Sequence, residues 1–146
     1  MFRRVTLILD AAPLVALADR QDPLGTQIET LLQQESGELV VPAPVTAEVD
    51  YLLGRRLGRR ARLAFLDDLA AGRFTVGYLE ADDHVIVVGL ERRYADLDVG
   101  IADLSVVVLA ERWSTRRLLN FDDRHFRVLA ERAPTQRRAV HVAAER

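Results

Sequence analysis

The sequence contains no cysteine and no lysine, and no apolar run in it approaches the length of a membrane-spanning helix. Without cysteine the chain cannot form a disulfide framework, a thiol nucleophile or a metal site held by cysteine sulfur, and this absence is compatible with a reducing compartment. Without lysine there is no amine for a Schiff base or for a phosphate-binding loop. A membrane helix needs about 20 consecutive apolar residues, and the first residues show no small-residue cleavage site. We therefore expect a soluble, cytoplasmic protein with no membrane partner.

An excess of charge of either sign is also absent, because 22 acidic residues nearly balance 20 basic ones and the formal net charge is −2. Net charge therefore gives no argument for a nucleic-acid partner, and any attraction for one has to be local. With 146 residues, 49% of them hydrophobic, the chain can bury a real core, which excludes wholesale disorder. We expect residues 1–146 to form a single domain.

Short apolar runs alternate with longer helical patterns along the chain, as they do in βαβ units. The patterns predict strands at 5–9, 39–41, 74–78 and 117–121, a last edge strand at 140–142, and helices at 12–19, 23–34, 44–57, 59–71, 80–94, 100–113 and 124–131. The first strand is apolar throughout, which is typical of a strand buried on both faces of a parallel sheet. The sequence thus predicts an α/β domain with four to five short, mostly parallel strands and helices on both faces.

Two aspartates directly follow predicted strands, Asp10 after the first and Asp122 after the fourth. Ligands of open parallel sheets bind at the carboxyl ends of the strands, so these positions are candidates for a binding site. The alternative is ordinary turn chemistry or helix capping.

Two further acids lie near the starts of predicted helices. A helical projection places Glu48 at the edge of an apolar stripe and Asp50 toward solvent, so we predict that Glu48 points inward, where an ionised carboxylate is costly unless it is paired. Asp103 opens a segment that is apolar almost all round from Ile101 to Ala110, which indicates a buried central helix. For both acids the alternative is a favourable interaction with the helix dipole.

If Asp10 and Asp122 end adjacent strands, and Glu48 and Asp103 begin the helices that face those ends, the four carboxylates meet at one rim. Carboxylates in such proximity cannot all stay ionised without a compensating charge. Either some are protonated or a divalent cation lies among them. A ligand set of oxygens alone favours Mg²⁺ or Mn²⁺ over zinc.

The four acids stand in recognisable motifs. Asp10-Ala-Ala-Pro-Leu14 follows the first strand, Glu48 lies in VTAEVDYLL, Asp103 in GIADLSVVVLAER and Asp122 in LLNFDDRHF. In order and spacing, from about Val5 to Phe126, this series resembles the PIN-domain ribonucleases. Among them it is most similar to the VapC-type toxins of bacterial type II toxin–antitoxin pairs.

This resemblance implies a three-layer α/β/α sandwich and Mg²⁺- or Mn²⁺-dependent cleavage of RNA. It also implies that Asp10, Glu48, Asp103 and Asp122 form the catalytic, metal-binding cluster. We expect Asp10 and Asp103 to be direct metal ligands, with Glu48 and Asp122 acting through water or orienting the nucleophile. The family commonly dimerises and is inhibited by an antitoxin, so the resemblance implies a homodimer, a cognate antitoxin partner and an RNA substrate, which could be transfer, ribosomal or messenger RNA.

The chain departs from the family pattern in places. Many relatives carry a hydroxyl residue where this chain has Ala11 and Ala12, and another where it has Asn120. Lost hydroxyls would loosen the surroundings of Asp10 and weaken metal affinity. A non-catalytic PIN-fold protein that binds a partner or RNA through a degenerate acidic site is therefore the alternative. Asp123 is a second candidate for the fourth acid.

Two other enzyme or signalling classes fit less well. A phosphatase with an aspartate nucleophile needs a second aspartate two residues after the first, where this chain has Ala12. A receiver domain needs a lysine.

Five arginines gather around the junction between two predicted helices, namely Arg55, Arg56, Arg59, Arg60 and Arg62. They could contact RNA phosphates, or they could be a solvated junction whose arginine stems cover apolar surface.

For the remaining polar and aromatic residues, the sequence indicates no catalytic or ligand-binding role. His84, His125 and His141 show no metal-ligand spacing, and we read Asp96 and Asp98 as helix-end or surface charges. Four aromatic residues are expected in core or interface positions, with no sign of a base-stacking platform, and these are Trp113, Tyr51, Tyr78 and Tyr94.

Overall fold

The structure, a computed structural model, describes residues 6–121 and the backbone of residues 140–141. Strands and helices alternate through this part of the chain. The strands are β1 (Leu7–Leu9), β2 (Leu39–Pro42), β3 (Thr75–Gly77), β4 (Arg117–Leu119) and β5 (Val140–His141). The helices are α1 (Ala11–Ala18), α2 (Pro23–Gln34), α3 (Ala43–Arg56), α4 (Arg59–Ala70), α5 (Ala81–Arg93), the 3-10 helix η1 (Ala95–Leu97) and α6 (Ile101–Arg112).

The five strands form one parallel sheet in the order β3-β2-β1-β4-β5. The strand β1 lies at its centre, where Leu7 is aligned with Leu39 of β2 on one side and with Arg117 of β4 on the other. All three residues of β1 are fully buried. This explains the continuous apolar run, because a central strand covered on both faces has no position at which a polar side chain reaches water.

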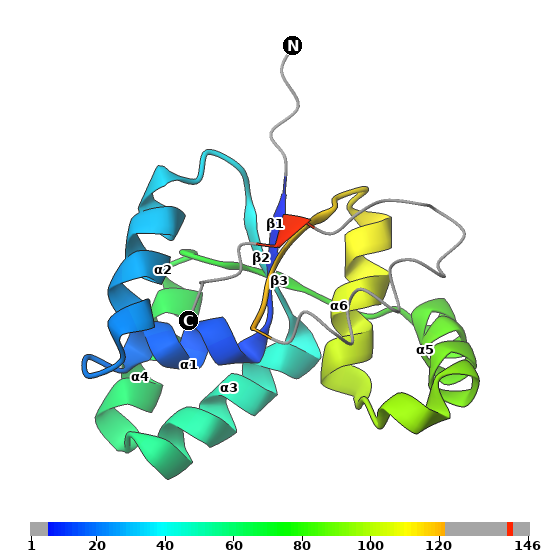
Figure 1. Ribbon diagram of the computed structural model, residues 1–146, viewed down its shortest axis with the longest axis horizontal. Helices are drawn as coiled ribbons and strands as arrows, with labels where there is room; N and C mark the ends of the chain where they lie inside the picture. The colour runs from blue at the N-terminus through cyan, green and yellow to red at the C-terminus, as the bar shows by residue number, and fades with distance from the viewer. Residues whose placement is uncertain (1–5, 122–139, 142–146) are drawn as a thin grey trace.

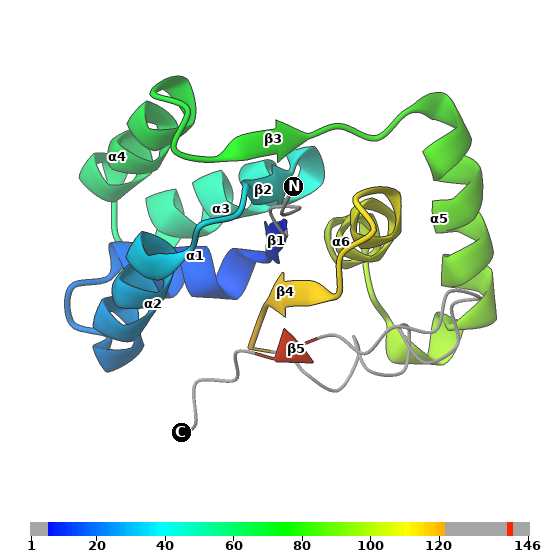
Figure 2. The ribbon, with the colours of Figure 1, turned by 90° about the horizontal axis from the view of Figure 1, so that it is seen from above.

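Helices cover both faces of the sheet and make a three-layer α/β/α sandwich. Figure 2 shows α1, α2, α3 and α4 on one side of the strands and α6 on the other, with α5 outside α6. The predicted fold class is confirmed, and the helix α6 is apolar nearly all round because it lies between the sheet and α5.

Two hydrophobic clusters hold the layers together. The larger one joins β1, β2 and β4 to the helices of the first face and to α6. A smaller cluster joins α5 and the loop after it to α6, through Val87, Tyr94, Val99, Leu104 and Val108. The outer helix α5 therefore has its own apolar anchor, one layer removed from the sheet.

Polar contacts fix the helices of the first face against the sheet. Arg117 of β4 forms a two-pronged ion pair with Glu35, the residue that ends α2, and the bond from Arg117 Nη1 to Glu35 Oε1 is 2.7 Å long. Arg73, which precedes β3, donates to Glu29 of α2 at 2.9 Å and to Asp68 of α4 at 3.1 Å. Bidentate arginine–carboxylate pairs fix orientation as well as charge, so these two arginines set where α2 and α4 lie.

The predicted elements agree with the observed ones, with ends shifted by a few residues. The helix 23–34 is found with the predicted bounds, because Asp22 caps it by accepting a 2.9 Å hydrogen bond from the backbone of Leu24 and Pro23 opens it. The 3-10 helix Ala95–Leu97 was not predicted. The predicted helix 124–131 lies outside the described residues. No helix in the described ranges is both long enough and apolar enough to cross a membrane.

Candidate functional site

The candidate site lies at the carboxyl ends of the two central strands. Asp10 directly follows β1 and Asn120 directly follows β4, and the backbone N–H of Asp10 donates a 3.0 Å hydrogen bond to the carbonyl oxygen of Leu119. The chain order of the strands reverses beside β1, with β2 and β3 on one side and β4 and β5 on the other. Such a switch point is where open parallel sheets bind their ligands.

Asp10 is a buried carboxylate that does not cap a helix. It occupies the N-cap position of α1, yet its side chain accepts no capping hydrogen bond from that helix, and the residue is only 7% exposed. The helix-capping alternative for Asp10 therefore does not apply. Burying a carboxylate is costly unless a partner compensates its charge, so a buried acid at a strand end is a candidate ligand for a cation.

Glu48 and Asp103 approach each other across the same edge of the sheet. The helix α3 packs against α6, and Figure 1 shows their first turns beside the lower end of β1. Partial burial of the Glu48 carboxyl and the neighbouring negative charge of Asp103 both raise the pKa of Glu48 above its ordinary value of 4.5. The two carboxylates thus repel each other, as expected of acids gathered for a cation.

One part of the sequence interpretation was wrong, because Glu48 does not point into the core. It is an exposed residue, while Asp50 is half-buried and lies 3.9 Å from the Nε of Arg62 on α4. The projection identified the buried stripe of α3 correctly, since Val45, Val49 and Leu53 are fully buried. It could not show that α6 would flank Glu48 and that α4 would cover Asp50.

Asn120 is a buried amide beside Asp10 at this edge. The residue is 3% exposed, and within the described residues neither its Nδ2 nor its Oδ1 has a hydrogen-bond partner. Buried amides normally have partners, so this one marks a place for water or a ligand. The sequence analysis noted Asn120 only as a departure from the family pattern. Its position two residues before Asp122 was the feature of the sequence that could have identified it as a site residue.

The donor set fits a small hard cation. Among the described residues no group of three or more acidic or histidine side chains is placed to hold a metal ion. Mg²⁺, however, is ordinarily held by one or two carboxylates and keeps several waters, with substrate phosphate supplying further oxygens. Carboxylates at this edge meet that chemical requirement, and the repulsion between Glu48 and Asp103 is of the kind that a cation relieves.

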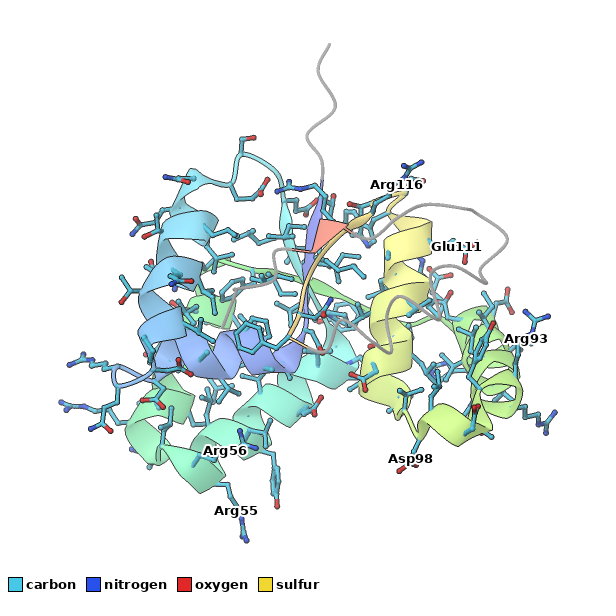
Figure 3. The ribbon with its side chains drawn as sticks, in the orientation of Figure 1. Arg55, Arg56, Arg93, Asp98, Glu111 and Arg116 are labelled. Atoms are coloured by element: carbon cyan, nitrogen blue, oxygen red, sulfur yellow. The ribbon has the colours of Figure 1, made fainter. Side chains whose placement is uncertain are left out.

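The other predicted residues fall in several places. Asp122 and Asp123 lie outside the described residues, so the predicted four-acid cluster stays a prediction. Asp96 and Asp98 are exposed, as expected for surface charges, and Asp98 lies in the turn before α6 (Figure 3). His84 is exposed and its Nδ1 lies 2.9 Å from the carbonyl oxygen of Glu80.

The predicted arginine group has one member with an internal partner. Arg62 pairs with Asp50, and its side chain lies against Gly54, where an added Cβ would approach Arg62 Nη1 to 2.9 Å. Arg56 and Arg60 line a cavity of about 820 Å³ between α1, α2 and α4. These two residues, and Arg55 and Arg59 as well, are exposed.

The aromatic residues also divide. Tyr94 is buried in the cluster between α5 and α6, and Trp113 packs against the main core. Tyr51 and Tyr78 are 64% and 70% exposed, so neither belongs to the core.

Comparison with known sequences gives a family match and a named relative. Residues 7–132 match the model of the PIN domain family. The chain is 36% identical over 123 residues to ribonuclease VapC26 of Mycobacterium tuberculosis, an alignment that covers 84% of this chain and 91% of that relative.

Solved structures with the same fold include three of known source. VapC20 of Mycobacterium tuberculosis, described as a sarcin-ricin loop cleaving toxin, superposes with a TM-score of 0.71 at 18% identity, covering 77% of this chain and 86% of that chain. VapBC2 of Rickettsia felis, bound to a DNA fragment from its promoter, superposes with a TM-score of 0.63 at 16% sequence identity. FitAcB of Neisseria gonorrhoeae superposes with a TM-score of 0.58 at 17% sequence identity. Each of these two alignments covers 84% of this chain and 92% of the other. At these identities the likeness concerns the fold.

Proposed function

The chain belongs to the PIN domain family, and on that premise we propose that it is a Mg²⁺- or Mn²⁺-dependent endoribonuclease that acts as the toxin of a toxin–antitoxin pair. The observation that carries the proposal is the repulsive Glu48–Asp103 pair, which lies at the strand ends where Asp10 is buried. The homology to a ribonuclease supports RNA as the substrate.

The proposal assigns a role to each of the four acids. Asp10 and Asp103 would hold the cation directly, and this assignment is supported by the burial of Asp10 at the strand end and by the position of Asp103 in the first turn of α6. Glu48 and Asp122 would bind it through water or orient the attacking water. When bound, the cation neutralises charge on the scissile phosphate and lowers the pKa of a bound water. Water attacks phosphorus, the P–O3′ bond breaks, and the products carry a 5′-phosphate and a 3′-hydroxyl.

The proposed biological setting extends the same homology. We take residues 1–146 as one domain in the cytoplasm, acting as a homodimer and inhibited by a cognate antitoxin. Of this setting, the toxin role is supported by the similarity to VapC26 and to the fold of the VapC20 toxin.

A cleavage assay tests the enzymatic part of the proposal. The purified full chain is incubated with labelled RNA in Mg²⁺, in Mn²⁺ or in EDTA, beside Asp10→Asn, Asp103→Asn and the control Glu91→Gln, which changes an exposed acid on α5. We expect cleavage only with a cation and a loss of about 100-fold or more in both site variants, because each removes charge stabilisation from the transition state. Cleavage in EDTA, or by Asp10→Asn, would contradict the mechanism.

The second candidate is a PIN-fold protein that binds RNA without cutting it. It is favoured by Ala11 and Ala12, which stand where many relatives have hydroxyl residues. Tight RNA binding by the wild type, without cleavage under any of these conditions, would identify this alternative.

A further inference from the structure

Between Val45 and Arg55 the helix α3 exposes one stripe of side chains that includes Glu48. From Val45 to Arg55 the exposed residues are Ala47, Glu48, Tyr51 and Arg55. At about 100° per residue, Arg55 lies about 20° from Glu48 around the helix and Tyr51 about 60° on the same side. The stripe therefore carries an acid, an aromatic ring and a cation in order, starting at the candidate site.

Tyr51 is unusual in its exposure. Its ring is 64% exposed, whereas Val49 and Leu53 on the opposite side of the same helix are fully buried. The backbone of Tyr51 lies three residues, about 4.5 Å along the helix axis, beyond that of Glu48. A large planar side chain held on a rigid helix, with most of its surface open, offers a stacking surface at low conformational cost.

Arg55 is an exposed cation on the same stripe as Glu48 and Tyr51. Within the group of five arginines, Arg62 is paired with Asp50, and Arg56 and Arg60 line the cavity beside α1 and α2. Arg55 is exposed and forms no ion pair with any described residue, and Figure 3 shows it projecting outward from the last turn of α3. It lies about 10 Å along the axis from Glu48.

We propose that this α3 stripe, Glu48, Tyr51 and Arg55, binds the single-stranded RNA segment next to the scissile phosphate. An unpaired base stacks on the Tyr51 ring, and a neighbouring backbone phosphate pairs with the Arg55 guanidinium. The proposal rests on the proposed ribonuclease function, to which it adds the residues that hold the strand beside the scissile phosphate and the direction in which the strand leaves the site.

Charge and shape favour this occupant over others. An anionic strand whose scissile phosphate lies at the acids needs a cation close by to remain bound to a chain of net charge −2, and Arg55 supplies one on the same helix face. Aromatic rings beside cationic side chains are the usual surface for single-stranded nucleic acid. A duplex hides its base faces in the stack, so stacking on Tyr51 requires an unpaired base.

Binding measured without cleavage tests the proposal. In an Asp103→Asn background, fluorescence anisotropy follows a labelled single-stranded RNA of about 12 nucleotides. We expect Tyr51→Ala to weaken binding by roughly five- to 100-fold and Tyr51→Phe to retain it, since the stacking face remains. We expect Arg55→Ala to weaken binding and to lower the slope of log affinity against log salt by about 1, and Arg55→Lys to keep that slope.

Matched controls and a spectroscopic signal separate stacking from a structural effect. Tyr78→Ala removes an equally exposed ring after β3, and Arg93→Ala removes an exposed arginine on α5, far from α3 in Figure 3. Both should bind RNA as the background does. A 2-aminopurine base placed along the RNA should lose fluorescence on binding at one position, and Tyr51→Ala should abolish that loss.

The outcomes distinguish this proposal from the function on which it rests. Unchanged RNA affinity in both Tyr51→Ala and Arg55→Ala would contradict the proposal that the stripe binds RNA, even if the wild type cleaves RNA. A change of oligomeric state in these variants, with unchanged RNA affinity, would show that the stripe is a protein interface. This result would also contradict the proposal that the stripe binds RNA. If the wild type binds RNA through the stripe but cleaves no RNA, the proposed role of the stripe is supported and the proposed ribonuclease function is contradicted.

Discussion

Glu48 of α3 and Asp103 of α6 repel each other in the folded protein. The negative charge of Asp103 and the partial burial of Glu48 both raise the pKa of the Glu48 carboxyl. The contact between α3 and α6 does not depend on these two acids, because apolar side chains hold the two helices together. The repulsion is therefore a cost that the metal-free protein bears at its candidate site.

Removing that repulsion should stabilise the metal-free protein. The raised pKa means that ionised Glu48 disfavours the folded state above its folded pKa, and that this cost disappears below about pH 4.5, where Glu48 is protonated in both states. We expect Glu48→Gln in EDTA to raise the free energy of unfolding at pH 7 by roughly 0.2–1 kcal/mol, because solvent screens an exposed pair. Urea unfolding at pH 7 and at pH 4 measures it, and Glu91→Gln is the matched control. A destabilised Glu48→Gln variant at pH 7 would show that the pair is not repulsive.

Divalent cations should raise the melting temperature of the wild type. A ligand bound only by the folded state stabilises it by mass action, by about 2.7 kcal/mol at 100 times the dissociation constant. We expect Mg²⁺ and Mn²⁺ to raise the melting temperature and Asp103→Asn to abolish most of the increase, as followed by thermal unfolding at constant ionic strength. An equal increase in both proteins would place the cation elsewhere.

The Arg117–Glu35 pair should make stability fall in acid. The hydrogen bonds from Arg117, and to a lesser extent the backbone N–H of Gly37, lower the pKa of Glu35 below 4.5 despite its burial. A lowered folded pKa contributes stability that is complete above about pH 4.5 and is lost as the pH falls through the folded value. We expect Glu35→Gln to cost about 1–2 kcal/mol at pH 7 and little at pH 2, by urea unfolding across this range. A cost independent of pH would mean that packing, not charge, is what Glu35 provides.

Two glycines should respond in opposite ways to the same substitution. A Cβ added at Gly25 of α2 would lie 2.6 Å from the carbonyl oxygen of Ala16 in α1, whereas one added at Gly89 of α5 would meet nothing within 4 Å. We expect Gly25→Ala to destabilise the protein by about 1–3 kcal/mol, because backbone has to move. Gly89→Ala should stabilise it by about 0.5–1 kcal/mol through helix propensity. Thermal unfolding of the two variants gives the comparison, and a neutral Gly25→Ala would show that α1 and α2 separate at little cost.

Many of the strands and helices could be predicted because the sequence patterns that indicate them involve only residues close together in the chain. Apolar runs at Leu7–Leu9 and Leu39–Pro42, and the cap at Asp22, depend on a few neighbouring residues, and the structure has all of these elements. The positions of Asp10 and Asp103 at an element's end followed from the same patterns. The 3-10 helix at Ala95–Leu97 did not, because its three residues carry no periodicity.

The environment of each side chain could not be read from the same patterns. A helical projection gave the buried stripe of α3 correctly, but it misjudged Glu48 as inward. The reason is that a projection describes one helix alone, whereas burial depends on which other helix covers each side. Only packing against α4 made Asp50 half-buried, and only packing against α6 brought Asp103 beside Glu48.

The amino-acid sequence by itself determined the α/β class, the strand and helix positions, and the family to which the chain belongs, since these depend on periodicity and on short motifs. The tertiary structure alone decided that Glu48 and Asp103 repel, that Arg62 pairs with Asp50, and that Tyr51 remains open to solvent. Such relationships arise between elements that are distant along the chain. They are fixed by packing, which no single element's pattern contains.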